Sequence, residues 1–185
     1  MLNIAIIIGS TRTNRIGPTI ARWVYEIAKE RDDAAFELID IADYDLPLMD
    51  EPKPPMAGDY TQPHTIRWAK KIEPFDGYVF VTPEYNQSTC AALKNAIDFL
   101  YKEWNNKAAA FVGYGGTYGL RAVQSLRPIM AQMQMADVRA QVGFSLFTDF
   151  EDGAFKPASR HIEEVNDMLD QLIAWAGALR PLREN

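Results

Sequence analysis

The sequence predicts an α/β protein in which five parallel strands form a sheet with helices on both faces. Short apolar runs, typical of strands buried on both faces, alternate along the chain with segments whose apolar residues recur every three or four positions. Strands joined through helices make right-handed crossovers, so this alternation favours a parallel sheet between two helical layers. The chain has 185 residues, 48% of them hydrophobic, which is enough to build a core.

The first strand and helix are predicted from the amino-terminal segment. Residues 3–8 are rich in isoleucine and are followed by a glycine, so they predict a buried strand. Residues 18–28 place apolar side chains along one stripe of a helix. Pro18 suits the first helical turn, where no hydrogen bond depends on its missing N–H.

A strand, a long loop and a helix are expected next. Residues 36–41 predict the second strand. Residues 45–63 contain five prolines, which disfavour regular structure and predict a long surface loop. A helix is expected over residues 65–73.

The middle of the chain repeats the pattern twice. Residues 77–82 and 108–113 predict the third and fourth strands. Residues 90–101 and 120–134 predict the helices that follow them.

The last part predicts one more strand and one more helix. Residues 138–142 are expected to form the fifth strand, and residues 143–156 to be irregular. Residues 161–179 carry the apolar stripe of a long helix. Because no internal repeat or separating linker is visible, residues 1–185 are expected to form one domain.

Composition limits the classes of function. The 19 basic and 25 acidic residues give a net charge of −6, which disfavours nucleic acid or an anionic membrane as a partner. No apolar run approaches the roughly 20 residues that span a bilayer, so a cytoplasmic protein is expected. One cysteine and two histidines exclude an intramolecular disulfide and leave no zinc-ligand cluster, so no metal is expected.

The loop after the first strand is a candidate phosphate site. Ligands of such sheets bind at the carboxyl ends of the strands, where the strand order reverses. This first loop (residues 9–17) offers backbone amides at a helix start, several hydroxyls and the charges of Arg12 and Arg15. Its glycine spacing matches neither a nucleoside-triphosphate loop nor the dinucleotide fingerprint. The alternative is an ordinary turn with solubilising arginines.

The loops after the third and fourth strands could hold a flat ring. The second loop (residues 82–88) would present backbone groups to the edge of a planar heterocycle, with Tyr85 covering part of it. The third loop (residues 113–119) has four glycines and two tyrosines, and glycine lets a ring approach the backbone closely. Either loop could be a plain turn. The topology brings all three loops to one rim, which favours a shared site.

Other reactive side chains are expected to serve packing or solvation. Cys90 has no histidine beside it, so a core position is expected. His64 is expected at the surface, His161 at the start of the last helix, and the Glu84 carboxylate in water. No catalytic side chain is therefore predicted, and a bound cofactor would carry any redox chemistry.

Three blocks of sequence carry a family resemblance. They are Gly9-Ser10-Thr11-Arg12 with Arg15, Pro83-Glu84-Tyr85-Asn86-Gln87-Ser88 leading into Leu93-Lys94-Asn95-Ala96-Ile97-Asp98, and Tyr114-Gly115-Gly116 with Gly119-Leu120-Arg121-Ala122. In these blocks the chain resembles the NADPH-dependent FMN reductases, which include azo-dye, quinone and chromate reductases. The resemblance implies a three-layer, flavodoxin-like, doubly wound sheet. Many members have proline where this chain has Cys90, so a slightly less rigid turn is expected there.

The resemblance implies FMN as the bound cofactor and NADPH or NADH as the electron donor. The first loop would hold the FMN phosphate, and the other two loops would hold the isoalloxazine ring. The implied cofactor-binding residues are Ser10, Arg12, Asn14, Arg15, Ile16, Gly17, Pro83, Glu84, Tyr85, Asn86, Ser88, Gly115 and Gly116. A homodimer or homotetramer, with the flavin near a subunit boundary, is also implied.

The activity implied is transfer of hydride from NADPH through FMN to a small acceptor such as a quinone, an azo compound, chromate or free flavin. A shared stacking place for donor and acceptor predicts ping-pong kinetics. One alternative is a flavodoxin-type electron carrier without its own NADPH reaction. Another is a non-redox nucleotide or phosphosugar binder that uses the first loop alone.

Overall fold

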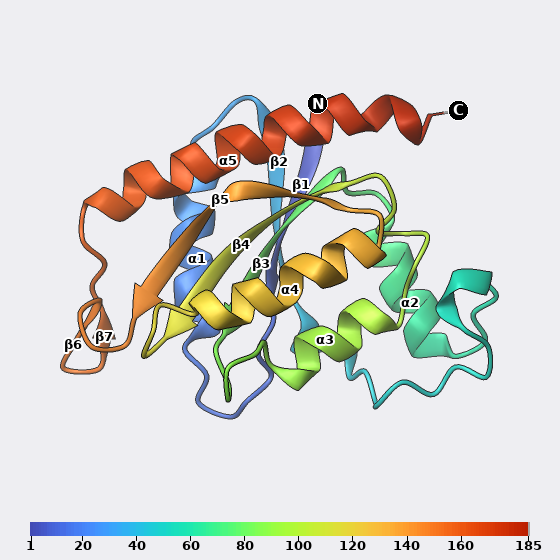
Figure 1. Cartoon of the computed structure of the whole chain (residues 1–185), viewed down its shortest axis with the longest axis horizontal. Coiled ribbons are helices and arrows are strands. Elements are labelled where there is room, and N and C mark those ends of the chain that lie inside the picture. Colours follow the sequence, from blue (N-terminus) through green and yellow to red (C-terminus); the bar gives the residue numbers. More distant parts are fainter. Residues whose placement is uncertain (185) are drawn as a thin grey trace.

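The computed structural model describes residues 1–184 and has a central sheet of five strands (Figure 1). The strands are β1 (Leu2–Ile8), β2 (Ala34–Asp40), β3 (Gly77–Pro83), β4 (Ala108–Gly115) and β5 (Ala136–Ser145). The spatial order is β2-β1-β3-β4-β5, and every neighbouring pair is parallel. This flavodoxin-like order confirms the predicted fold class, and it reverses between β1 and β3.

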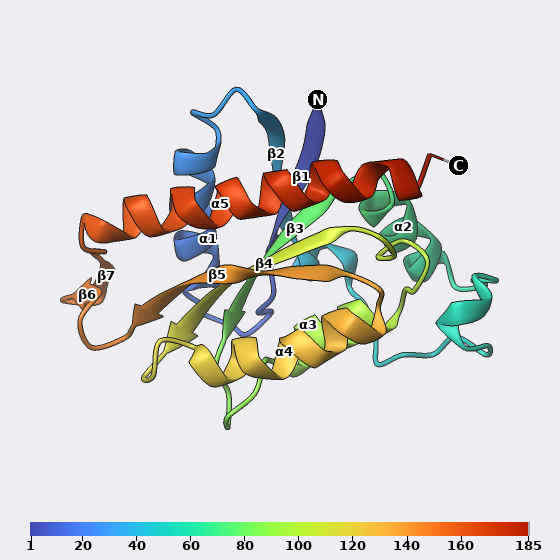
Figure 2. The same ribbon diagram turned by 45° about the horizontal axis from the view of Figure 1, so that its top comes forward.

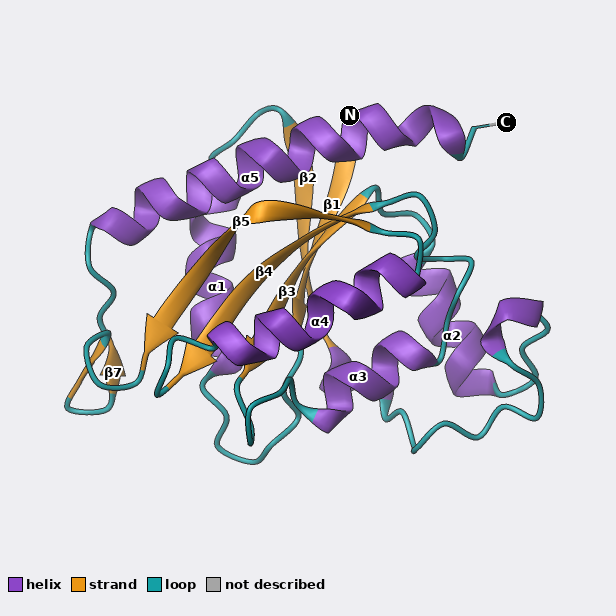
Figure 3. Ribbon diagram, viewed as in Figure 1, coloured by secondary structure: helices purple, strands orange, loops and turns teal. Residues whose placement is uncertain are grey.

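Helices cover both faces of the sheet and make three layers (Figures 2 and 3). They are α1 (Gly17–Ala28), α2 (Pro63–Ile72), α3 (Ala91–Asp98), α4 (Leu120–Gln132) and α5 (Arg160–Leu179). Side chains of α1 and α5 pack with Ile4 and Ile6 on one face, and those of α2, α3 and α4 pack with Ala5 and Ile7 on the other. Burial on both faces explains why the central strands β1, β3 and β4 are continuous apolar runs, whereas the outer strands β2 and β5 also carry exposed polar residues.

Helix α3 ends at Asp98 rather than at residue 101. The Tyr101 N–H, which would continue the helix by donating to the Ile97 carbonyl oxygen, donates instead to the Tyr60 hydroxyl at 3.2 Å. The Ile97 carbonyl oxygen accepts from the Trp104 indole N–H at 3.0 Å. Phe99 is fully buried just beyond this point. The apolar stripe therefore continues past Asp98, although the helical conformation of the backbone ends there.

The segment after β5 is more regular than predicted. Strand β5 reaches Ser145, and a two-stranded antiparallel pair follows, β6 (Phe150–Glu151) and β7 (Ala154–Phe155). Asp152 and Gly153 between them have φ of 49° and 79°. Asp-Gly with positive φ is typical of a tight hairpin turn, so the sequence did contain a signal for this pair.

The proline-rich segment forms a loop, as predicted. The 3₁₀ turn η1 (Ile41–Tyr44) precedes it, the 3₁₀ turn η2 (Pro55–Ala57) lies within it, and its last residue, Pro63, begins α2. Among the described helices, none has the length and hydropathy that crossing a membrane requires.

Candidate functional site

All three loops line one slot at the carboxyl edge of the sheet. The slot has a volume of about 100 Å³. Its lining residues are Arg12, Arg15 and Ile16 from the first loop, Pro83, Glu84 and Tyr85 from the second, Tyr114 and Gly115 from β4 and the third, and Leu146 from the loop after β5. The structure thus brings together turns that are far apart in the sequence.

The first loop leaves hydrogen-bond donors unused at the start of α1. Ile16, at the N-cap, has no side chain that can cap the helix, and Pro18 in the first turn has no N–H. Within residues 1–184, the backbone N–H groups of Thr13 and Asn14 meet no acceptor. The Thr19 N–H at the helix start donates to the Ile16 carbonyl oxygen at 3.0 Å, so the free amides belong to the loop just before the helix. Free amides next to a helix start without a side-chain cap are suited to an anion.

The two arginines of this loop have different surroundings. Arg15 makes a two-pronged ion pair with Asp40 at the end of β2, with Nη1–Oδ1 at 2.8 Å and Nη2–Oδ2 at 2.6 Å. It also donates to the carbonyl oxygen of Ser10. Arg12 is exposed at the slot, and no carboxylate of the described chain pairs with it. Arg15 therefore holds the loop in shape, whereas the charge of Arg12 is available to a ligand.

The second loop is a tight turn that presents Tyr85. Tyr85 and Ser88 exchange two backbone hydrogen bonds of 2.9 and 3.0 Å. Asn86 and Gln87 between them have φ of 48° and 72°, which is the pattern of a type I′ turn. The Tyr85 hydroxyl lies 3.4 Å from Ser10 Oγ, so the second loop also contacts the first.

Glu84 connects the second loop to the third. Its carboxylate accepts hydrogen bonds from Thr117 Oγ1 (2.8 Å), from the Arg121 backbone N–H (3.1 Å) and from Arg121 Nη1 (3.0 Å). The Glu84 side chain is only 8% exposed, so the expectation that it stands in water is wrong. Burial raises its pKa, but the hydrogen bonds from Thr117 and Arg121 outweigh this, and the pKa lies below its ordinary value.

Glycine is required where the third loop folds back on β4. Gly119 has φ of 69°, and a Cβ there would lie 2.3 Å from the backbone nitrogen of Tyr114. A Cβ on Gly115 would lie 3.1 Å from Cβ of Glu84. The glycines therefore allow the second and third loops to pack closely.

The cysteine is buried and structural. Cys90 is 3% exposed and packs in the core against the other face of the sheet from α1, as predicted. Its Sγ donates to the carbonyl oxygen of Gly9 at 3.2 Å, which fastens the start of α3 to the first loop. Burial raises the pKa of the Cys90 thiol, so it is a poor nucleophile.

The two histidines lie away from the slot lining. His161 begins α5 as expected, but it is buried at 1% exposure and contacts Asp149 and Glu164. His64 keeps 23% of its side chain exposed and contacts Asp50.

The implied cofactor-binding residues fall into two groups. Arg12, Arg15, Ile16, Pro83, Glu84, Tyr85 and Gly115 line the slot. Ser10, Asn14, Gly17, Asn86, Ser88 and Gly116 belong to the same loops without lining it. The Ser88 hydroxyl, for example, donates to Ser125 of α4.

Sequence reasoning missed four contributors to the site, one of which is Tyr114 of the third loop. Asp40 ends β2, a strand whose exit was not considered, although a carboxylate closing an apolar strand was a usable signal. Leu146 lies in a segment expected to be irregular. The role of Arg121 depends on a contact with Glu84, 37 residues away, and no local pattern reveals it.

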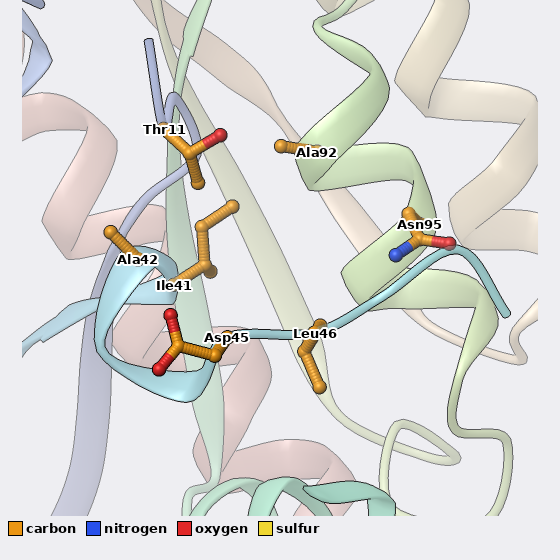
Figure 4. Close-up of a pocket in the computed structure, with 7 residues that line it drawn as sticks. All are labelled: Thr11, Ile41, Ala42, Asp45, Leu46, Ala92 and Asn95. Atoms are coloured by element: carbon orange, nitrogen blue, oxygen red, sulfur yellow. The ribbon is translucent and has the colours of Figure 1, made fainter. Parts of the chain in front are cut away.

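A larger cavity lies between η1 and α3, next to Thr11 of the first loop (Figure 4). It has a volume of about 310 Å³ and is lined by Thr11, Ile41, Ala42, Asp45, Leu46, Ala92 and Asn95. Among these residues Asp45 alone carries a charge, which is negative, and the Asn95 amide already bonds Pro47 and Met49. The smaller slot beside Arg12 is therefore better suited to an anionic ligand.

Known proteins resemble the chain in both sequence and fold. Residues 2–149 match the family described as NADPH-dependent FMN reductase. An NAD(P)H-dependent FMN reductase of Schizosaccharomyces pombe is 39% identical over 168 residues, 88% of this chain and 84% of that protein. A quinone reductase of Pseudomonas putida is 32% identical over 161 residues, 80% and 82% of the two chains. The solved structure of a flavoenzyme NAD(P)H:(acceptor) oxidoreductase from Paracoccus denitrificans shares the fold, with a TM-score of 0.75 and 21% identity over 96% of this chain and 98% of that one.

Proposed function

The chain belongs to the NADPH-dependent FMN reductase family and is an oxidoreductase of the NAD(P)H-dependent FMN or quinone reductase type. From this premise we propose that it binds FMN in the slot formed by the three loops and uses NADPH or NADH to reduce a small acceptor. When bound, FMN supplies the redox chemistry by accepting hydride and passing two electrons on. The side chains position the reactants.

The start of α1 carries the proposal. A terminal phosphate has a charge of about −2, and here it would meet an uncapped helix start, unused amides and the unpaired Arg12. Charge-assisted hydrogen bonds from these donors would hold the phosphate. The ion pair between Arg15 and Asp40 keeps the loop in the shape that aims these donors.

The second and third loops would hold the flavin ring. Tyr85 and the backbone around Gly115 line the slot, and Glu84 fixes the spacing between the two loops. The slot encloses only about 100 Å³, which is less than the three fused rings occupy. Part of the ring would therefore lie outside the slot, open to solvent, and donor and acceptor would stack in turn on this exposed part. This arrangement supports ping-pong kinetics.

The acceptor class we propose is a quinone. Relatives named quinone reductases support this choice. A pure electron carrier would show no direct reaction with NADPH, and family membership favours the enzyme over that alternative.

Removing the charge of Arg12 tests the phosphate position. We expect Arg12→Ala to weaken FMN binding by about 1–3 kcal/mol, because a charge-assisted hydrogen bond is lost. Arg12→Lys keeps the charge and should lose less. The measurement is the dissociation constant from a fluorescence titration of FMN into apoprotein.

Arg22→Ala is the matched control, since Arg22 is an exposed arginine on α1 outside the slot lining. It should leave the dissociation constant unchanged. An Arg12→Ala protein that binds FMN as tightly as wild type would contradict the proposed site. A wild-type protein that retains no flavin after free FMN has been removed, and that oxidises no NADPH in the presence of FMN and a quinone, would contradict the proposed function itself.

A further inference from the structure

The loop after β5 places two apolar side chains beside the slot. Leu146 lines it and is 44% exposed, while Phe147 is 80% exposed. A Cβ on Gly116 would lie 3.3 Å from the Phe147 ring, so this ring stands against the backbone of the third loop. Neither side chain contributes to the phosphate position or to the contacts between loops described above.

Hydrogen bonds donated by backbone N–H groups hold this segment close to β4 and β5. The Leu146 N–H donates to the Gly115 carbonyl oxygen at 3.1 Å, and the Phe147 N–H donates to Ser145 Oγ at 3.2 Å. The Asp149 N–H donates to the Ser145 carbonyl oxygen at 3.0 Å. Residues 145–149 therefore form a closed turn in which Phe147 is the more exposed of the two apolar side chains, at 80% against 44% for Leu146.

A buried carboxylate anchors this turn. Asp149 is 1% exposed, and its Oδ2 accepts the Ser145 N–H at 2.8 Å. Its Oδ1 lies 3.0 Å from His161 Nε2, and His161 Nδ1 lies 2.7 Å from Glu164 Oε2. Because buried polar groups that have all their partners rigidify their surroundings, the backbone that carries Phe147 is held firmly in place.

We propose that Leu146 and Phe147 bind the ring of the electron acceptor and select planar aromatic acceptors. This inference rests on the proposed function and adds the residues that determine specificity. The ring of Tyr85, 37% exposed, lines the same slot as Leu146. An exposed phenylalanine next to a slot offers a stacking face, and such contacts between aromatic rings are geometrically specific. A small hydrophilic oxidant has no aromatic ring to stack on Phe147, so this side chain would not increase its affinity.

Binding without turnover tests the inference. Oxidised, FMN-loaded protein is titrated with 2-methyl-1,4-naphthoquinone by calorimetry, with no NADPH present. We expect Phe147→Ala to raise the dissociation constant of the quinone about tenfold, as loss of one aromatic contact implies. Phe147→Tyr keeps the ring and should restore the wild-type value. In steady state, the KM for the quinone should rise in Phe147→Ala by a similar factor with kcat largely retained, because the lost contact is made in both ground and transition states.

Trp175→Ala is the matched control. Trp175 is also an exposed aromatic residue, at 49%, on α5. It lies near the opposite edge of the sheet, because the neighbouring Gly177 faces Leu2 at the start of β1. Trp175→Ala should leave the affinity for the quinone unchanged.

The outcomes separate the two proposals. Unchanged quinone affinity in Phe147→Ala, with FMN bound as in wild type, overturns the acceptor site and leaves the proposed function standing. A parallel loss of FMN affinity also overturns it, since Phe147 would then belong to the cofactor site. A wild-type protein that binds no FMN overturns both.

Discussion

Cys90 occupies a backbone position that proline would also fit. At the N-cap of α3 it has φ of −72° and ψ of 147°, within the range that the proline ring allows. The resemblance led us to expect a less rigid turn at this position. The thiol supplies a contact that proline lacks, the hydrogen bond to Gly9. The hydrogen bond from the Cys90 thiol to the first loop thus restrains the backbone at a position where the proline ring restrains it in many family members.

The reactivity of Cys90 should report this burial. With a raised pKa and 3% exposure, the native thiol should react with a disulfide reagent at pH 8 at least about 100-fold more slowly than in the unfolded chain, because reaction requires a costly opening of the structure. Ellman's reagent with and without guanidinium measures this. Cys90 is the only cysteine in the sequence, so the signal is unambiguous. Rapid reaction of the folded protein would show that the start of α3 opens readily.

At the scale of elements, the slot depends on how loops are joined rather than on any one loop. The first loop is tied to β2 by Arg15 and Asp40, and the second loop is tied to the third by Glu84. In addition, the Glu84 N–H donates to the Tyr114 carbonyl oxygen at 2.9 Å, which continues the pairing of β3 with β4 beyond the strand. These links arrange the binding groups before any ligand arrives, which lowers the cost of binding.

A double-mutant cycle should measure the link between the second and third loops. Glu84→Gln removes the charge, and Thr117→Val removes a donor to it. We expect each change to weaken FMN binding several-fold and the double variant to lose less than the sum, with a coupling of about 1 kcal/mol. The measurement is the FMN dissociation constant of the four proteins. Glu151→Gln, in the exposed ion pair with Lys156, is the control and should have no effect. Additive losses would contradict a direct link between the loops.

The elements could be predicted where local pattern decides them. The central strands β1, β3 and β4, buried on both faces, appear as continuous apolar runs, and the outer strands β2 and β5 were found as well. The end of α3 depends on Trp104, whose indole takes a helix carbonyl, and such a contact leaves no local trace. The candidate site shows the same division. The topology pointed to the three loops, whereas Arg121 and Leu146 act through contacts across the fold that the sequence pattern does not reveal.

Across the whole molecule, the two edges of the sheet carry different chemistry. The carboxyl edge holds the slot, and the amino edge holds Lys107, which directly precedes β4 and is 3% exposed. Its Nζ donates to the Glu73 carbonyl oxygen at 2.7 Å and to the Tyr78 hydroxyl at 3.0 Å, and no carboxylate of residues 1–184 forms an ion pair with it. Burial, and next the charge of Arg183, lower the pKa of Lys107 to about 7. The fold therefore holds a lysine that is costly to keep charged.

Global stability should consequently rise with pH above neutrality. The pKa of Lys107 is 10.5 in the unfolded chain and about 7 in the folded one, so between these values the unfolded chain binds more protons. The cost of the buried charge is fully present below pH 7 and disappears as pH rises towards 10.5, at up to about 1.4 kcal/mol per pH unit.

The variant Lys107→Met tests this, because methionine keeps most of the length of the lysine side chain and removes its charge. We expect it to be more stable than wild type at pH 6, with the advantage shrinking steadily by pH 9.5, in urea unfolding followed by circular dichroism. Lys102→Met, an exposed lysine near the same edge, should show no such trend. A difference between Lys107→Met and wild type that stays constant from pH 6 to 9.5 would mean that the buried ammonium keeps its ordinary pKa.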